Sequence, residues 1–210
     1  MSDEEQVEKL REWWDTNGRS VMAGVIIAIA SVVGWQQYGA WQDRQADAAA
    51  AAYMHFMDAV ERGGDPDAVV TRAERLLEDH GGSAYASMAA LHLAAVQHQV
   101  GDPSGARETL RWVREEGSDR GFRDLGRLRL AQLLYGEDEL DAALDALEGA
   151  TDGPYEARYN ELRGDIHSAR GDRDAAREAY RAALEADDLP AMRRSLITLK
   201  LNELGGEVPS

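Results

Sequence analysis

The sequence contains no cysteine, and among its 210 residues only five are proline and two are phenylalanine. The absence of cysteine excludes disulfide bonds and thiolate metal sites. The low proline content favours helices, because Ala, Leu, Arg and Glu lose little side-chain freedom in a helix. With so few phenylalanine rings, the core must consist mainly of Leu, Ala, Val and Tyr side chains, which suit closely packed helices. The composition therefore predicts an all-α protein.

Positive charge is also scarce. The chain has 23 Lys and Arg against 39 Asp and Glu, which gives a formal net charge of −16. Binding to nucleic acid relies on Lys and Arg that displace counterions from phosphates, so a strongly acidic chain is repelled. We therefore expect no nucleic-acid partner.

Motifs for catalysis are missing as well. The sequence has no phosphate-binding glycine loop, no His-Glu-x-x-His and no Gly-x-Ser-x-Gly. His92 and His98 would lie on different sides of a helix, and the acidic run 137–139 lacks the ligand spacing of a calcium loop. These absences predict no catalytic, cofactor-binding or metal site and no small-molecule substrate. A hydrolytic site hidden in a helical domain is the alternative, for which the sequence offers no nucleophile and base.

One long apolar stretch is present near the start of the chain. Residues 21–35 carry no charge, and residues 20–41 would span about 33 Å as a helix, enough to cross a bilayer core of about 30 Å. The flanks carry aromatic residues that favour membrane interfaces, namely Trp13 and Trp14 before the stretch and Trp35, Tyr38 and Trp41 at its end. The sequence therefore predicts a single transmembrane helix over 20–41.

Two other interpretations of this stretch are a buried core helix and a cleaved leader. A core helix of a globular protein normally keeps a polar stripe, which residues 21–35 lack. A leader begins with a short positive region and ends in a small-x-small cleavage site, whereas residues 1–20 are rich in acids and no such site follows. The first residue of the mature protein distinguishes the anchor from the leader.

The orientation follows from the basic residues beside the span. Lys9, Arg11 and Arg19 precede it, whereas the next residues after Trp41 offer only Arg44. Basic residues stay on the cytoplasmic side of a membrane. We therefore expect a cytoplasmic segment (1–19), the membrane helix (20–41) and a domain on the far side of the membrane (42–210), which is a periplasmic domain if the source is a Gram-negative bacterium and the membrane its inner membrane.

The cytoplasmic segment has its own helical pattern. Val7, Leu10, Trp13 and Trp14 recur at helical spacing among acidic residues, which predicts a short amphipathic helix. Asn17-Gly18 would end this helix, because both residues tolerate a left-handed backbone conformation.

The rest of the chain predicts a series of short helices. Asp65-Pro66, Asp102-Pro103 and Asp188-Leu189-Pro190 resemble helix starts, and glycines fall at the expected ends. The expected helices cover residues 43–62, 66–79, 83–99, 103–115, 120–135, 139–148, 154–169, 173–186 and 190–204. Short connections between them predict antiparallel pairs, with the last helix as a C-terminal cap.

The helix pairs repeat at the spacing of tetratricopeptide repeats (TPRs). The clearest unit is Tyr159–Leu184, in which small, turn and aromatic residues follow the TPR order: Gly164, Gly171, Ala176, Tyr180, Ala183 and Leu184. Ala106, Ala142 and Ala176, taken as equivalents, lie 36 and 34 residues apart, close to the TPR period of about 34. The sequence therefore predicts a TPR-like α-solenoid, and an ordinary helical bundle is the alternative.

The whole chain resembles the YfgM-type ancillary subunits of the bacterial Sec translocon. The resemblance rests on residues 4–18 (EEQVEKLREWWDTNG), on the apolar span ending in Gly34-Trp35, on the repeat GDIHSARGDRDAAREAY and on the closing RRSLITLKLNEL. It implies association with a SecYEG-type channel and with a membrane-anchored periplasmic chaperone of the PpiD type, and a part in handling exported proteins. An envelope-assembly or cell-division scaffold unrelated to export is the alternative.

A TPR array binds partners through the concave face formed by the first helices of its pairs. The 36- and 34-residue steps place ten residues on that face: Met88, Leu91, His98, Asp124, Arg127, Leu134, Tyr135, Arg158, Glu161 and Asp165. We expect these residues to contact a protein partner, although many could serve packing instead.

Overall fold

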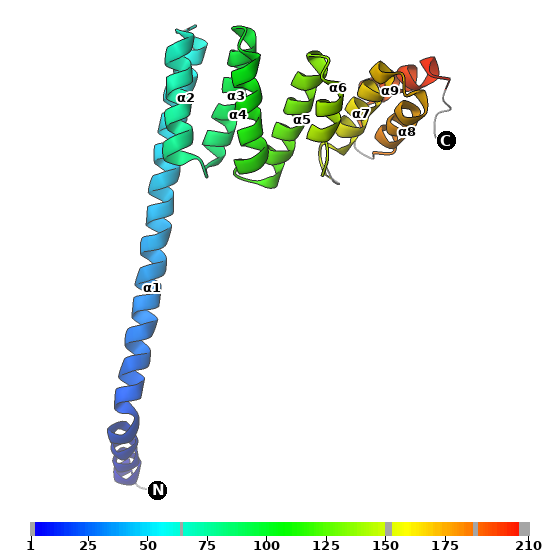
Figure 1. The fold of residues 1–210 in the computed structure, drawn as a ribbon. Helices are drawn as coiled ribbons and strands as arrows, with labels where there is room; N and C mark the ends of the chain where they lie inside the picture. The colour runs from blue at the N-terminus through cyan, green and yellow to red at the C-terminus, as the bar shows by residue number, and fades with distance from the viewer. Residues whose placement is uncertain (1–2, 64, 150–152, 187–188, 206–210) are drawn as a thin grey trace. The chain divides into compact units, whose positions relative to one another are not determined.

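The computed structural model describes residues 3–63, 65–149, 153–186 and 189–205. Every regular element within these ranges is an α-helix, as Figure 1 shows, which confirms the all-α prediction. The helices are α1 (Asp3–Glu61), α2 (Pro66–His80), α3 (Ala84–Gln99), α4 (Pro103–Glu116), α5 (Arg120–Gly136), α6 (Leu140–Ala146), α7 (Glu156–Arg170), α8 (Arg173–Leu184) and α9 (Ala191–Glu203).

The chain divides into two compact units, residues 1–48 and 49–210. The first unit consists of the greater part of α1. Its stretch from Met22 to Trp41 exposes apolar side chains all round the helix, with Ile26, Ile27 and Ile29 each more than half exposed. A candidate membrane span begins at Met22, and the most apolar part of this span has none of its residues buried within the structure. The assignment of residues 1–19, 20–41 and 42–210 to three compartments remains a prediction.

Helix α1 corrects two predicted boundaries. It continues through Asn17-Gly18, where a helix end was expected, and through residue 42, where a new helix was expected. Within this continuous helix, Asn17 donates its side-chain amide to the Trp13 carbonyl at 3.0 Å. A helical glycine costs only about 1 kcal/mol, whereas a break leaves several backbone groups unsatisfied. The helix therefore continues. The side chains of Val7 and Leu10, which define the predicted amphipathic face, lie outside the described residues.

The helices of the second unit pack mainly on their neighbours along the chain. Each helix from α2 to α8 contacts the next, and the further contacts between α3 and α5 and between α5 and α7 join alternate helices. Neighbouring helices are antiparallel (Figure 1). Contacts confined to neighbouring repeats are typical of a solenoid, so the predicted array of antiparallel pairs is confirmed.

The starts of these helices follow from their capping residues. The carboxylates of Asp65 and Asp102 accept hydrogen bonds from backbone N–H groups in the first turns of α2 and α4, as their sequence position predicts. Ser83 and Asp119 cap α3 and α5 in the same way. The third predicted start includes Asp188, which lies outside the described residues.

The structure moves the repeat register by one residue in the middle pair. In α4, α6 and α8 the residue four after the cap is buried, and its N–H donates to the cap carbonyl. These residues are Ala106, Ala143 and Ala176. Ala142, the predicted equivalent, is partly exposed. The sequence contains two adjacent alanines here, and only burial distinguishes them. The correct steps are therefore 37 and 33 residues.

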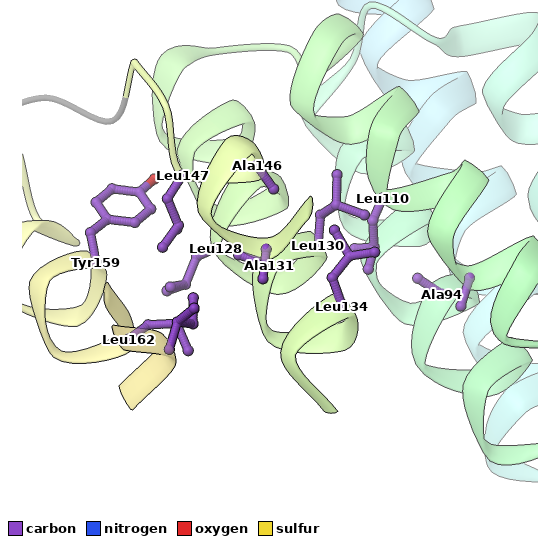
Figure 2. Packing of buried hydrophobic residues seen from close by; sticks show 13 residues of the cluster. Ala94, Leu110, Leu128, Leu130, Ala131, Leu134, Ala146, Leu147, Tyr159 and Leu162 are labelled. Carbon is purple, nitrogen blue, oxygen red and sulfur yellow. The ribbon is translucent and has the colours of Figure 1, made fainter. Parts of the chain in front are cut away.

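The helices of each pair meet at a small residue twelve positions before this alanine. Gly164 on α7 faces Tyr180 on α8 so closely that an added Cβ would lie 2.4 Å from the tyrosine ring. The corresponding pairs are Ala94 with Leu110 and Ala131 with Leu147, all four buried in the central core cluster of Figure 2. Where the residue on the second helix is leucine, which is smaller than tyrosine, the residue on the first helix is alanine and not glycine. The small residues of the TPR pattern set the closeness of each helix pair.

Helix α9 ends the array. Ile197 and Leu201 are buried in one cluster with Tyr180, Ala183 and Leu184 of α8. The remaining face of α9 is exposed, and no helix follows it within the described residues. Its position agrees with the predicted C-terminal capping helix.

Candidate functional site

An apolar pocket of about 800 Å³ lies between helices α3, α4 and α5. Three of the predicted partner-contacting residues, Met88, Leu91 and His98, line its α3 wall. The other lining residues are His92, Ala94, Ala95, Ala106, Leu110, Phe122, Leu125, Arg129, Gln132, Leu133, Gly136 and Glu137. We call this pocket the groove. Its apolar walls and few polar groups are typical of sites that hold a side chain of a ligand.

Helical spacing brings these side chains together. On α3 the lining residues Met88, Leu91 and Ala95 follow each other at steps of three or four, so they form one stripe. On α5 the lining residues Leu125, Arg129 and Gln132 form the matching stripe. Helices α3 and α5 begin successive pairs of the array and contact each other. The groove is therefore formed by equivalent faces of two repeats.

The α5 wall of the groove was missed at the level of sequence. The expected step of 36 residues carries Met88 to Asp124 and His98 to Leu134. The corrected step of 37 carries Met88 to Leu125, which lines the groove. The burial of Ala143 shows that the step is one residue longer than expected. Nothing in the sequence distinguishes Ala143 from Ala142.

Asp124, Arg127 and Leu134 occupy structural positions. Leu134 is 4% exposed and lies in the central core, so it offers almost no surface. Asp124 is 7% exposed and pairs with Arg127 at 3.2 Å. Arg127 also donates to the Gly149 carbonyl at 3.2 Å, and the Tyr159 hydroxyl donates to the Asp124 carbonyl at 2.6 Å. Burial, and then the charge of Asp124, raise the pKa of Tyr159. These contacts join α5 to α7.

Glu161 and Asp165 on α7 are both held by α9. Glu161 is 7% exposed and pairs with Arg193 at 2.6 Å and with Lys200 at 3.2 Å. Asp165 pairs with Lys200 at 2.8 Å and accepts a hydrogen bond from the Tyr180 hydroxyl at 2.7 Å. Burial lowers the pKa of Lys200, but its hydrogen bonds and charge interactions with the two carboxylates outweigh this, and the pKa is raised.

Tyr135 and Arg158 complete the predicted set. Tyr135 lines a smaller pocket of about 270 Å³ together with Asp165, Tyr180 and Lys200. Arg158 is half-buried on α7. The ten predicted residues are thus brought together in three groups: the groove wall on α3, the structural contacts of α5, and a charged cluster between α7 and α9. Whether they contact a partner remains a prediction.

Metal ligands do not gather in this structure. Across the described residues, no three His, Asp or Glu side chains come close enough together to hold a metal ion.

Short antiparallel helix pairs in register, small residues at each pair crossing and an apolar groove between successive pairs define a helical repeat protein of the TPR class. The chain belongs to the tetratricopeptide repeat-like domain family, whose model matches residues 11–206. This match includes much of α1 as well as the repeats.

Curated relatives match the chain over almost its whole length. It is 28% identical to the ancillary SecYEG translocon subunit of Escherichia coli (strain K12) over 203 residues, 97% of each chain. It is 26% identical over 204 residues, 97% of this chain, to the proteins of the same name from Haemophilus influenzae and Aggregatibacter actinomycetemcomitans, each covered to 98%. The resemblance inferred from the sequence is therefore confirmed.

Proposed function

We propose that this chain is a membrane-anchored TPR interaction module that associates with the Sec translocon. The observation that carries the proposal is the extent of the similarity. Relatives named ancillary SecYEG translocon subunit match 97% of the chain, so the apolar part of α1 and the repeat array align together. TPR repeats alone occur with many functions, whereas the combination with this N-terminal helix is more specific.

The exposed apolar side chains of α1 support a membrane anchor. Ile27 is 66% exposed and Ile29 59% exposed, and water would solvate both poorly. A bilayer would cover them, with the rings of Trp35, Tyr38 and Trp41 at one interface. The basic residues before the span support an orientation with the N-terminus in the cytoplasm and the array in the periplasm.

The groove supports a role as a docking surface without catalysis. In this proposal it receives a segment of a protein partner, and a membrane-anchored periplasmic chaperone of the PpiD type is one such partner. Gathering a chaperone beside the channel would assist the handling of newly exported proteins. The module itself would need neither cofactor nor metal.

An affinity purification tests the proposal. The full-length protein, tagged at its C-terminus, is purified from detergent-solubilised membranes after photo-crosslinking, and its neighbours are identified by mass spectrometry. We expect subunits of the Sec channel to be enriched over a control purification with an unrelated single-pass inner-membrane protein of similar abundance. Enrichment of cell-division or envelope-assembly proteins without channel subunits would contradict the proposal and favour the scaffold alternative.

A further inference from the structure

Arginines occur on three helices of the array: Arg129 on α5 lines the groove, Arg158 lies on α7, and Arg193 on α9 pairs with Glu161 of α7. Arg158 makes no hydrogen bond and no ion pair with any residue that the structure describes. Burial, followed by the charge of Arg193, lowers the pKa of Arg158, and Arg129 acts in the same direction. The charges of Arg129 and Arg193 thus both reach Arg158, and Glu161 acts in the opposite direction, in a chain whose formal net charge is −16.

The carboxylates nearby are engaged by other cations: Glu137, which lines the groove, pairs with Arg107 at 2.5 Å. Glu161 lies one turn from Arg158 along α7, but it already pairs with Arg193 and Lys200 and is 7% exposed. Arg129 donates to the neutral side chain of Gln132 at 3.1 Å. Arg129 and Arg158 therefore lack a carboxylate of their own.

Arg129 lies in the groove, and the repeat register relates Arg158 to the groove lining. Arg129 is one of the groove-lining residues of α5, and α5 contacts α7, which carries Arg158. Arg158 is the equivalent of Leu125 one repeat later, at the 33-residue step. The repeat position that presents Met88 and Leu125 to the groove is thus occupied by an arginine on α7.

We propose that the groove selects a peptide segment that carries a carboxylate beside its apolar residues, with the apolar side chains in the pocket and the carboxylate at Arg129 and Arg158. An arginine side chain can hold a carboxylate with two parallel hydrogen bonds. Packed helices lie about 8–10 Å apart and an extended chain advances about 3.3 Å per residue, so the carboxylate would follow the apolar residues by about three positions. This inference rests on the proposed docking function of the groove.

Peptide binding to the full-length protein in detergent micelles tests the inference by fluorescence anisotropy. The probe is a labelled peptide with three consecutive leucines, glutamate three positions later and an amidated C-terminus. A second peptide replaces the glutamate with glutamine. A third has glutamine and ends there in a free carboxylate, which separates an acidic side chain from a chain end. We expect the glutamate peptide to bind about tenfold more tightly than the glutamine peptide.

Variants assign this difference to the arginine. Arg158→Gln is expected to remove the preference for glutamate and leave the affinity for the glutamine peptide unchanged. The control Arg111→Gln changes an exposed arginine of α4 that does not line the groove, and it should keep the preference. Equal binding of all three peptides, with loss of binding in Leu91→Asp, would overturn the selectivity and leave docking intact. Failure of every peptide to bind would overturn both.

Discussion

At Gly164 the backbone of α7 approaches the ring of Tyr180 with no space for a side chain. Elsewhere in the array, alanine and leucine occupy the two positions. The side chain on one helix therefore determines how small the opposite residue must be. The sequence spacing of the repeat locates this pairing in the last helix pair, whereas in the middle pair the burial of Ala143 is needed to locate it.

Gly164→Leu is expected to destabilise the second unit by about 1–3 kcal/mol, because overpacking forces the two helices apart. Chemical denaturation of the full-length protein in detergent, followed by circular dichroism, measures the change. The control Gly82→Ala adds a methyl group where no atom lies within 4 Å. An unchanged midpoint for Gly164→Leu would contradict the repeat register.

A compensating change tests the pairing itself. Gly164→Ala together with Tyr180→Leu recreates the alanine and leucine pair of the other repeats. We expect the two substitutions to be coupled by about 0.5–3 kcal/mol in a double-mutant cycle. Simple additivity of the two effects would show that these residues do not limit each other.

Tyr180 also predicts a dependence of stability on alkaline pH. Burial, followed by its hydrogen bond to Asp165, raises the pKa of Tyr180 above its ordinary value. The stability from the neutral phenol is complete below about pH 10 and is lost above it, because the unfolded chain releases a proton that the folded chain retains. Tyr180→Phe should make the alkaline loss shallower, by an amount that approaches about 1.4 kcal/mol per pH unit only near pH 11, measured by urea denaturation between pH 9 and pH 11. Parallel profiles of the two proteins would contradict this.

At the scale of elements, the starts of α2 to α5 could be predicted from sequence because each has a capping Asp or Ser. The continuity of α1 could not, because Asn17-Gly18 is an equally good helix end on local grounds. The register of α6 failed for a similar reason, since Ala142 and Ala143 are identical in type. Local chemistry indicates where a helix can begin or end. Which of two similar residues faces the neighbouring helix is decided by burial.

The candidate site was predictable only in part. Helical spacing on α3 gives Met88, Leu91 and His98. The ion pairs of Glu161 with Arg193 and Lys200 join residues more than thirty positions apart along the chain. No local pattern marks such a pairing, so a buried carboxylate is indistinguishable in sequence from a solvated one.

The apolar face of α1 gives a prediction for the whole helix. Ile27→Asp combined with Ile29→Asp should release the protein from membranes, because each charge costs about 2.5–3.5 kcal/mol at the centre of a bilayer. Membrane fractionation measures the distribution. Ala46→Asp with Ala48→Asp provides a control on exposed positions of α1 beyond residues 20–41. Continued membrane association of the isoleucine variant would show that another element anchors the chain.

At the scale of the whole molecule, the absence of cysteine makes the topology directly measurable. Asn17→Cys and Ser195→Cys each introduce a single thiol, on α1 and on α9. A maleimide that enters the periplasm but does not cross the inner membrane should label the Ser195→Cys protein in intact cells. The Asn17→Cys protein should react only after the membrane is permeabilised. The opposite pattern would reverse the proposed orientation.

Through its ion pairs with α7, the last helix, α9, contributes to the resistance of the protein to proteolysis. A chain cleaved ahead of Ala191 would lose Arg193 and Lys200 together, and it would also lose the apolar side chains of Ile197 and Leu201 that pack on α8. The lost burial of Ile197 and Leu201 costs about 1.5–3 kcal/mol for each side chain, a large share of the stability of a small domain. Clipped copies would therefore unravel from their last repeat and become substrates for proteolysis, so that only intact molecules accumulate.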